Sequence, residues 1–234
     1  MAPPDMNVGV ALIVPVLNEA DTIADVVRAV PRDVVDEVIV VDGGSTDETV
    51  ARARAAGARV ILEPRSGYGS ACLAGVGATK HPVVAFIDGD GSDDPAEIHR
   101  LVAPILAGEQ DFVIGSRARG VREKGSMGLH QLIAGHIAGF FMRALYGVRY
   151  TDMCPLRAIR RDALERLRMR EKTYGWNLEM QMRAARAGLR ILELPIRHRN
   201  RAGGASKVAG NLRGSAKASW QIASTLVRIA NEMR

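Results

Sequence analysis

Short apolar blocks alternate with polar, helix-forming segments along the first half of the chain. Five blocks with apolar centres predict strands and cover residues 8–16, 36–42, 58–63, 82–88 and 111–117; the first is a continuous apolar run, which is typical of a strand buried on both faces. The segments between them predict helices over residues 21–30, 69–79 and 96–106, and one that begins at a capping box formed by Ser45 and Glu48. This alternation predicts an α/β fold with a mostly parallel sheet covered by helices on both faces.

The second half of the chain follows the alternation less regularly. A polar loop is expected over residues 120–128 and a helix over 129–146. Residues 150–164 predict an irregular stretch, a strand and a helix start, and they precede a helix over 177–188 and a strand over 189–199. The last segment, 211–234, predicts an amphipathic helix with a basic face. We therefore expect a single domain with a C-terminal amphipathic helix.

Composition narrows the class of protein. The chain has 234 residues, 47% of them hydrophobic, which is enough for one large α/β domain. Its two cysteines, Cys72 and Cys154, show no metal-ligand spacing and suit a reducing cytoplasm. We expect no signal peptide, and the least charged stretch, 125–142, is too polar for a membrane span.

The net charge of +6 is unevenly distributed, with acidic residues early and basic residues late. This asymmetry predicts an anionic partner for the second half, either phosphate groups or a membrane surface, rather than nucleic acid. A merely solubilising basic surface is the alternative.

The stretch "VVAFIDGDGSDDPAEI", residues 83–98, places four aspartates within seven positions after an apolar strand. Like charges so close repel one another, so a positive partner is expected. Ligands of open α/β sheets bind at the carboxyl ends of the strands, and polar residues follow four of the predicted strands there. They are Asn18 and Glu19, Asp42 to Asp47, Asp88 and Asp90, and Arg117.

A D-x-D pair can hold Mg²⁺ or Mn²⁺ that also bridges phosphate groups, so a divalent ion with a diphosphate is the favoured partner. An EF-hand fails because Asp93 and His99 stand where Gly and Glu are needed. A D-x-D-G-type phosphatase matches "DGDGS" locally, but three strand–helix units precede it here. A solvated acidic turn without a metal is a further alternative. A dinucleotide fold is weak, since "GYGSAC" carries only two of three glycines.

Several motifs together resemble glycosyltransferase family 2, which has the GT-A fold: "IVPVLNEADTI", "VDGGSTDET", "GYGSACLAG", "FIDGDGSDDP" and "GSR". "TDMCPLRAIRRDAL", "LEMQMRAARAGLRILELPI" and "RAGGASKV" resemble its dolichyl- or polyprenyl-phosphate sugar transferase branch. The resemblance covers about nine-tenths of the chain. It implies a nucleotide-sugar-binding half (1–118), an acceptor-binding half (119–200), and a phosphate-closing loop with the C-terminal helix (201–234).

The resemblance also implies roles for single residues. Asp88 and Asp90 would bind the metal ion and the donor, and Ser92 stands where the branch often has Gln, which leaves the metal preference open. Arg117 would meet an acceptor phosphate or the donor diphosphate. The nucleoside pocket would contain Pro15, Leu17, Glu19, Asp42 and Asp88; Arg201, Ser206 and Lys207 would close over phosphates; Asp152 and Glu179 would face the acceptor.

The implied activity is an inverting, metal-dependent transfer of a sugar from a GDP- or UDP-linked donor to a polyprenyl phosphate at the cytoplasmic membrane face. A lipid phosphate needs no strong base, whereas a hydroxyl acceptor needs a carboxylate with a pKa near 6–7. Peripheral membrane contact through the basic tail and a homodimer are further expectations. The alternatives are a transferase with a soluble acceptor, the D-x-D-G-type phosphatase, and a nucleotide-binding module without catalysis.

Overall fold

The structure is a computed structural model that describes residues 9–65, 67–126, 135, 139–140, 142–144, 146–201 and 228. The helix predicted over 129–146 lies largely outside these residues, and the tail helix over 211–234 does so apart from Arg228. Within the described residues, no helix is long and apolar enough to cross a membrane.

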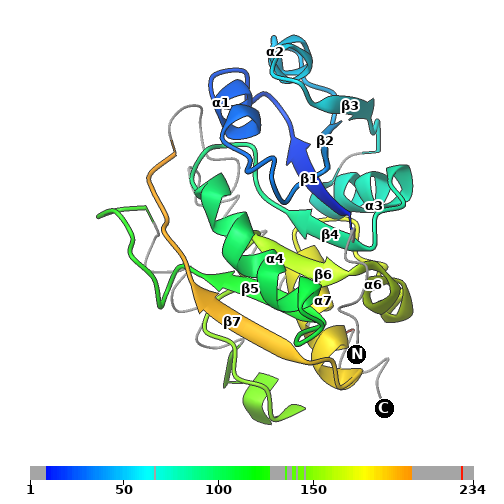
Figure 1. Cartoon of the computed structure of the whole chain (residues 1–234), viewed down its shortest axis with the longest axis vertical. Coiled ribbons are helices and arrows are strands. Elements are labelled where there is room, and N and C mark those ends of the chain that lie inside the picture. Colours follow the sequence, from blue (N-terminus) through cyan, green and yellow to red (C-terminus); the bar gives the residue numbers. More distant parts are fainter. Residues whose placement is uncertain are drawn as a thin grey trace.

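One seven-stranded sheet forms the centre of the molecule (Figure 1). Its strand order is β3-β2-β1-β4-β6-β5-β7. The strands are β1 (Val10–Val16), β2 (Glu37–Asp42), β3 (Arg59–Leu62), β4 (Val83–Phe86), β5 (Phe112–Ser116), β6 (Arg157–Arg160) and β7 (Ile191–Pro195). All five strands predicted in the first half are present. The predicted strand over 189–199 is shorter, because only its middle part pairs with β5 as β7.

Strand β6 is the exception to the parallel arrangement. It comes from the second half of the chain and inserts between β4 and β5, antiparallel to both. The two halves therefore share one sheet and one core. Antiparallel β6 leaves the other six strands with their carboxyl ends at the same edge.

Helices cover both faces of this sheet, as predicted for the α/β class. In Figure 1, α4 crosses in front of the sheet and α7 lies behind it, where Trp176 packs edge-to-face on Phe86 with ring centroids 6.3 Å apart. The helices are α1 (Ile23–Arg28), α2 (Thr49–Ala55), α3 (Tyr68–Ala78), a 3₁₀ turn η1 (Pro95–Glu97), α4 (Ile98–Leu106), α6 (Arg161–Leu167) and α7 (Trp176–Arg186).

Helix α3 is built from small residues because it must approach the strands closely. A Cβ atom at Gly75 would lie 2.5 Å from Ile13 on β1. At Gly67, where φ is +127°, a Cβ would lie 2.1 Å from the Lys172 carbonyl oxygen. Substitution at either position therefore requires the backbone or the core to move.

The capping box predicted at Ser45 is wrong. Helix α2 begins at Thr49, and the Ser45 hydroxyl instead accepts a hydrogen bond from the backbone N–H of Asn18 at 2.8 Å. Asp47 Oδ1 accepts from the backbone N–H of Thr49 at 3.0 Å. The polar residues that resemble a cap thus tie two neighbouring loops together.

Asp111 braces the start of β5 at the opposite edge of the sheet. Its carboxylate accepts two hydrogen bonds from the Arg190 guanidinium, at 3.0 and 2.8 Å, and one from the Arg190 backbone N–H at 2.9 Å. Arg160 adds a further contact at 3.2 Å. The Arg190 hydrogen bonds hold the pKa of Asp111 at about 2.

We predict that Asp111→Asn destabilises the protein by about 1–2 kcal/mol at pH 7, a figure reduced because Arg190 is half exposed. Because the folded-state pKa is depressed, this contribution is complete above about pH 4 and disappears as the pH falls toward 2. Urea unfolding of both proteins at pH 7, 5 and 3.5 measures it. The exposed Asp25–Arg28 pair supplies the control, since Asp25→Asn should change stability little. Equal effects of the two substitutions would contradict the brace.

Candidate active site

The loops that follow β1, β2 and β4 meet at the carboxyl edge of the sheet. Asn18 Oδ1 accepts a hydrogen bond from the backbone N–H of Thr46 at 2.8 Å, which joins the first loop to the second. The Thr22 hydroxyl donates to the Gly89 carbonyl oxygen at 2.7 Å, which joins the first to the third. Loops far apart in the sequence therefore form one fixed rim, as their position after parallel strands predicts.

Asp42 ends β2 with its two oxygen atoms in different situations. Oδ2 accepts hydrogen bonds from the backbone N–H groups of Gly44 and Ser45, both at 3.0 Å. Oδ1 is buried, and no residue in the described part of the chain donates a hydrogen bond to it. A buried carboxylate oxygen without a donor is suited to accept one from a ligand, such as a nucleobase N–H group.

The other predicted nucleoside contacts lie on the same rim. Pro15 is half-buried on β1 beside Val41 of β2. Leu17 is 38% exposed directly beyond the strand, and Glu19 is buried with its backbone N–H bonded to the Thr49 hydroxyl at 2.8 Å. The rim therefore offers an apolar edge next to carboxylates.

Asp88 and Asp90 lie beyond the end of β4, in a turn that also contains Asp93 and Asp94. Oδ1 of Asp88 is buried and accepts no hydrogen bond from the described residues. Burial and the nearby carboxylates of Asp90 and Asp93 raise the pKa of Asp88 to about 8. Asp90 Oδ1 accepts from the backbone N–H of Ser92 at 2.9 Å, which orients its carboxylate.

This carboxylate pair fits a divalent cation. An oxygen atom without a donor, within a group of negative charges, gains most from a positive ion. The described residues contain no cluster of three or more His, Cys, Asp or Glu side chains suited to a metal ion. A site of two carboxylates, such as Asp88 and Asp90, suits Mg²⁺ or Mn²⁺, because these ions are often bound by one or two carboxylates together with substrate phosphates and water.

Arg201 reaches this rim from the segment that follows β7. Its Nη2 atom donates to Glu19 Oε1 at 2.5 Å, and its Nε atom lies 3.3 Å from Asp90 Oδ2. The structure thus brings together Glu19, Asp90 and Arg201, as the sequence predicts. Ser206 and Lys207, predicted for the same phosphate-closing loop, lie outside the described residues.

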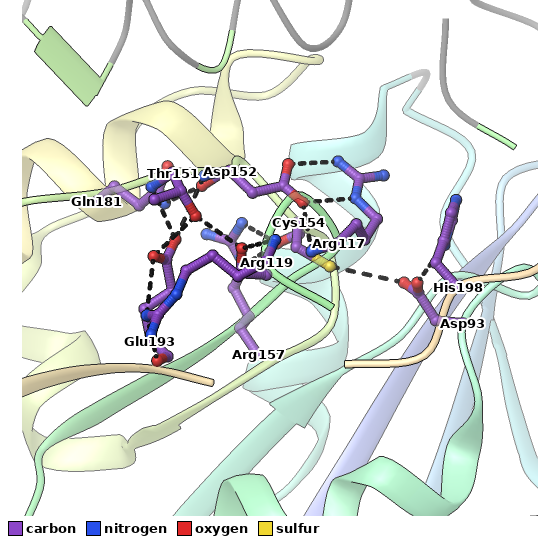
Figure 2. Close-up of polar contacts among 11 residues, drawn as sticks. Asp93, Arg117, Arg119, Thr151, Asp152, Cys154, Arg157, Gln181, Glu193 and His198 are labelled. Atoms are coloured by element: carbon purple, nitrogen blue, oxygen red, sulfur yellow. Dashed lines mark hydrogen bonds and ion pairs between the residues drawn. The ribbon is translucent and has the colours of Figure 1, made fainter. Parts of the chain in front are cut away.

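No sequence pattern indicates the Asp93–His198 pair, which the structure forms next to the rim. His198 Nδ1 lies 2.7 Å from Asp93 Oδ1, and both side chains are buried. The Cys154 thiol donates to Asp93 Oδ2 at 3.8 Å (Figure 2). No local spacing predicts a pairing between residues 105 positions apart. The chain reaches this place because the backbone N–H of Arg199 bonds the Ser92 carbonyl oxygen at 2.8 Å.

Arg117, at the end of β5, is fixed by Asp152. Its Nε and Nη2 atoms donate to the two oxygens of Asp152, both at 2.8 Å, and its backbone N–H donates at 2.9 Å (Figure 2). Although burial favours the neutral form, Cys154, Asp152 and Asp93 hold the pKa of Arg117 well above its usual range. Arg117 and Asp152, both predicted to meet the acceptor, thus form one rigid ion pair without net charge, in which Arg117 is the cation.

Glu179, the remaining acceptor candidate, lies on α7 and is fully buried. Its Oε2 accepts from the backbone N–H groups of Arg170 and Glu171 at 2.9 and 2.6 Å, and its Oε1 accepts from Arg183 at 2.9 Å. These contacts hold the loop before α7. Its predicted contact with an acceptor stays a prediction.

Solved structures with a similar fold share this arrangement of strands. The structure of glucosyl-3-phosphoglycerate synthase from Mycobacterium tuberculosis in complex with Mn²⁺, uridine-diphosphate and glucosyl-3-phosphoglycerate aligns with a TM-score of 0.75 and 27% identity. The alignment covers 95% of this chain and 80% of that one. This match confirms the predicted GT-A fold.

The alignments with two curated relatives cover most of the length of each relative. An uncharacterized glycosyltransferase of Mycobacterium tuberculosis is 39% identical over 210 residues, 88% of this chain and 92% of that protein. An undecaprenyl-phosphate mannosyltransferase of Micrococcus luteus is 31% identical over 229 residues, 88% of this chain and 90% of that protein. The model of "Glycosyl transferase family 2" matches residues 11–168. With this match and these relatives, the chain belongs to glycosyl transferase family 2.

Proposed function

We propose that this glycosyltransferase moves a sugar from a UDP-linked donor to a small, soluble acceptor that carries a phosphate group, with Mg²⁺ or Mn²⁺ as cofactor. The observation that carries the proposal is the fixed Arg117–Asp152 pair close to the carboxylate of Asp88. Arg117 is close enough for its charge to lower the pKa of Asp88. A cation for the acceptor phosphate thus lies beside the expected place of the donor.

Structural neighbours support the choice of donor and acceptor. Structures of glucosyl-3-phosphoglycerate synthase from Mycobacterium tuberculosis contain Mn²⁺, uridine-diphosphate-glucose and phosphoglyceric acid, or Mg²⁺ and uridine-diphosphate. UDP-glucose and phosphoglyceric acid are therefore the first pair to assay. This proposal replaces polyprenyl phosphate, the acceptor favoured by the sequence, as the leading candidate.

The residues of this chain would divide the work of transfer. Asp42 and Glu19 would bind the nucleoside, while Asp88 and Asp90 would hold the metal ion and orient the diphosphate. When bound, the ion would supply positive charge to the leaving nucleoside diphosphate. Arg201 would turn from Glu19 and Asp90 toward the diphosphate, where its charge stabilises the transition state. Arg117 would hold the acceptor phosphate and so orient the attacking oxygen.

A second candidate acceptor is polyprenyl phosphate. It is favoured because Asp152 and Glu179, the two carboxylates predicted as candidate bases, are both held by hydrogen bonds to other residues. Arg117 lowers the pKa of Asp152 although burial would raise it. Glu179 is bonded to two backbone N–H groups and Arg183. Asp152 therefore lacks the pKa near 6–7 that activating a hydroxyl requires, and both oxygens of Glu179 are already engaged in hydrogen bonds, whereas a phosphate oxygen attacks without a base. The similarity to the undecaprenyl-phosphate mannosyltransferase supports the same acceptor.

Further expectations from the sequence stay predictions. Phe140, in the helix predicted over 129–146, is 69% exposed, which suits peripheral contact with a membrane surface. Inversion at the anomeric carbon follows from direct attack by the acceptor, and the anomeric proton coupling in the product measures it. A homodimer and the division of the domain near residue 118 are likewise kept as predictions.

We predict that Asp90→Ala weakens Mn²⁺-dependent UDP binding by at least about 100-fold, since even residues that only orient metal ligands cost 10–100-fold. Calorimetry of UDP with Mn²⁺, with Mg²⁺ and with chelator measures the change, and chelator should act on the unaltered protein as the substitution does. Asp94→Asn is the matched control. It removes a charge from the same turn, but its side chain binds the Ala96 backbone N–H and Arg199. Undiminished binding by Asp90→Ala would contradict the metal site.

We predict that the protein transfers glucose from UDP-glucose to phosphoglyceric acid without lipid or detergent. In Arg117→Ala, the KM for the acceptor should rise by about tenfold or more, because a charge-assisted contact is lost, while UDP binding changes little. Product analysis with phosphoglyceric acid and, separately, polyprenyl phosphate in vesicles measures it. Transfer only to the vesicles would reject the soluble acceptor in favour of the second candidate.

A further inference from the structure

We propose that Glu193 is a positioning residue for the anion site: it fixes the Thr151–Asp152 turn, and through that turn it holds Arg117 in place. The proposal rests on the proposed function for the identity of the anion, a phosphate group. Glu193 makes no hydrogen bond to Arg117, and among the predicted site residues it contacts only the backbone of Asp152, so its role differs from those of the residues described above.

The carboxylate of Glu193 holds the turn at three points (Figure 2). Oε1 accepts hydrogen bonds from the backbone N–H groups of Thr151 and Asp152, at 2.9 and 3.3 Å. Oε2 accepts from the Thr151 hydroxyl at 2.9 Å. Two successive backbone N–H groups and a hydroxyl on one carboxylate leave the turn little freedom to rotate.

Strand β7 places this carboxylate in a buried position, where a charge is costly unless hydrogen bonds or an opposite charge stabilise it. Glu193 pairs in register with Ile114 of β5, and its side chain is only 7% exposed. Burial raises its pKa, while the bonds from Thr151 lower it. Arg119 contributes a partial counter-charge at 3.7 Å from Oε2. A buried carboxylate between two leucines of a strand is explained by the turn that it organises.

Asp152 transmits the position of the turn to Arg117. Its carboxylate accepts three hydrogen bonds from Arg117, two from the guanidinium and one from the backbone N–H. A rotation of the turn would therefore disturb all three hydrogen bonds. Gln181 Nε2 donates to the Asp152 carbonyl oxygen at 2.8 Å and closes the turn from α7. The Arg117 Nη1 atom has no hydrogen-bond partner among the described residues and is the natural donor to an anion.

The end of β5 is part of the same network. Ser116 Oγ lies 2.7 Å from the Thr151 hydroxyl and accepts a hydrogen bond from the backbone N–H of Arg119 at 3.1 Å. Arg117 is therefore held from its own strand and from the turn at once. Removing the acceptor oxygens of Glu193 should loosen the second of these attachments.

The test compares substitutions that separate hydrogen bonding from charge. Glu193→Met keeps the length of the side chain and removes both acceptors, whereas Glu193→Gln keeps one oxygen for the two backbone N–H groups and an amide for the Thr151 hydroxyl. Thr151→Val, which removes the hydroxyl alone, is the milder variant if Glu193→Met does not fold. Asp111→Asn is the matched control, because it removes a buried carboxylate at the opposite edge of the same strands.

Two readouts distinguish positioning from general destabilisation. The first is the NMR signal of the Arg117 Nε–H group, identified by its absence in Arg117→Ala. The second is the affinity for inorganic phosphate, followed by phosphoglyceric acid and by a short prenyl phosphate in separate titrations. UDP binding with Mn²⁺ is measured in parallel as the reference.

We expect Glu193→Met to shift the Arg117 signal and weaken phosphate binding by about tenfold, the scale seen for residues that orient a binding group. Glu193→Gln and Asp111→Asn should resemble the unaltered protein, and UDP binding should change less than about twofold. The effects of Glu193→Met and Arg117→Ala should not add in the double variant.

An unchanged Arg117 signal in Glu193→Met, or in Thr151→Val where the first does not fold, would overturn the proposal. Equal losses in Glu193→Gln and Glu193→Met would also overturn it, because the charge and not the hydrogen bonds would then matter. If Arg117→Ala binds phosphate normally, the anion role assigned under the proposed function fails. A shifted Arg117 signal in Glu193→Met would then show that Glu193 still positions Arg117, so that only the anion role is at fault.

Discussion

The crowding of carboxylates at one edge of the sheet is the constraint on which the site depends. Asp88, Asp90 and Asp93 lie within six positions beyond β4, and burial with mutual repulsion raises the pKa of Asp88 to about 8. Such a group is tolerated only where positive charge is brought to it. Arg117, held by Asp152 at the end of β5, is near enough for its charge to lower the pKa of Asp88, and Arg201, from the segment after β7, contacts Asp90. A cation and a diphosphate would take the place beside Asp90 that Arg201 partly fills.

The topology explains how distant residues reach this edge. Because β6 inserts antiparallel between β4 and β5, the chain that leads into it passes the carboxyl edge and leaves Asp152 next to Arg117. Because β7 is parallel to β5, the segment after it arrives at the same edge with His198 and Arg201. The second half thus completes a rim that the first half begins, and neither half would balance its charges alone.

The sequence predicted the parts of the fold that local patterns control. The apolar runs located the strands of the first half, and the carboxyl-end rule brought Glu19, Asp42, Asp88, Asp90 and Arg117 to one edge. Features that depend on distant pairing escaped it: the direction of β6, the Asp93–His198 contact and the Glu193 brace. Ser45 illustrates the reason, since its spacing to Glu48 matches a capping box, yet its hydroxyl is used by Asn18 of another loop. Local sequence patterns do not predict a hydrogen-bond partner that lies in a distant loop.

The acidic residues of the rim fall into two groups according to what their oxygen atoms contact. Asp93 and Asp152 have partners on both oxygens, supplied by His198 with Cys154 and by Arg117, so they serve to hold other residues. Asp42 and Asp88 each keep one buried oxygen without a hydrogen bond from the described residues. A buried polar atom of this kind is costly unless a ligand satisfies it, so we propose that the second group takes part in binding. Residue type alone does not separate the two groups, because all four are aspartates; their partners do.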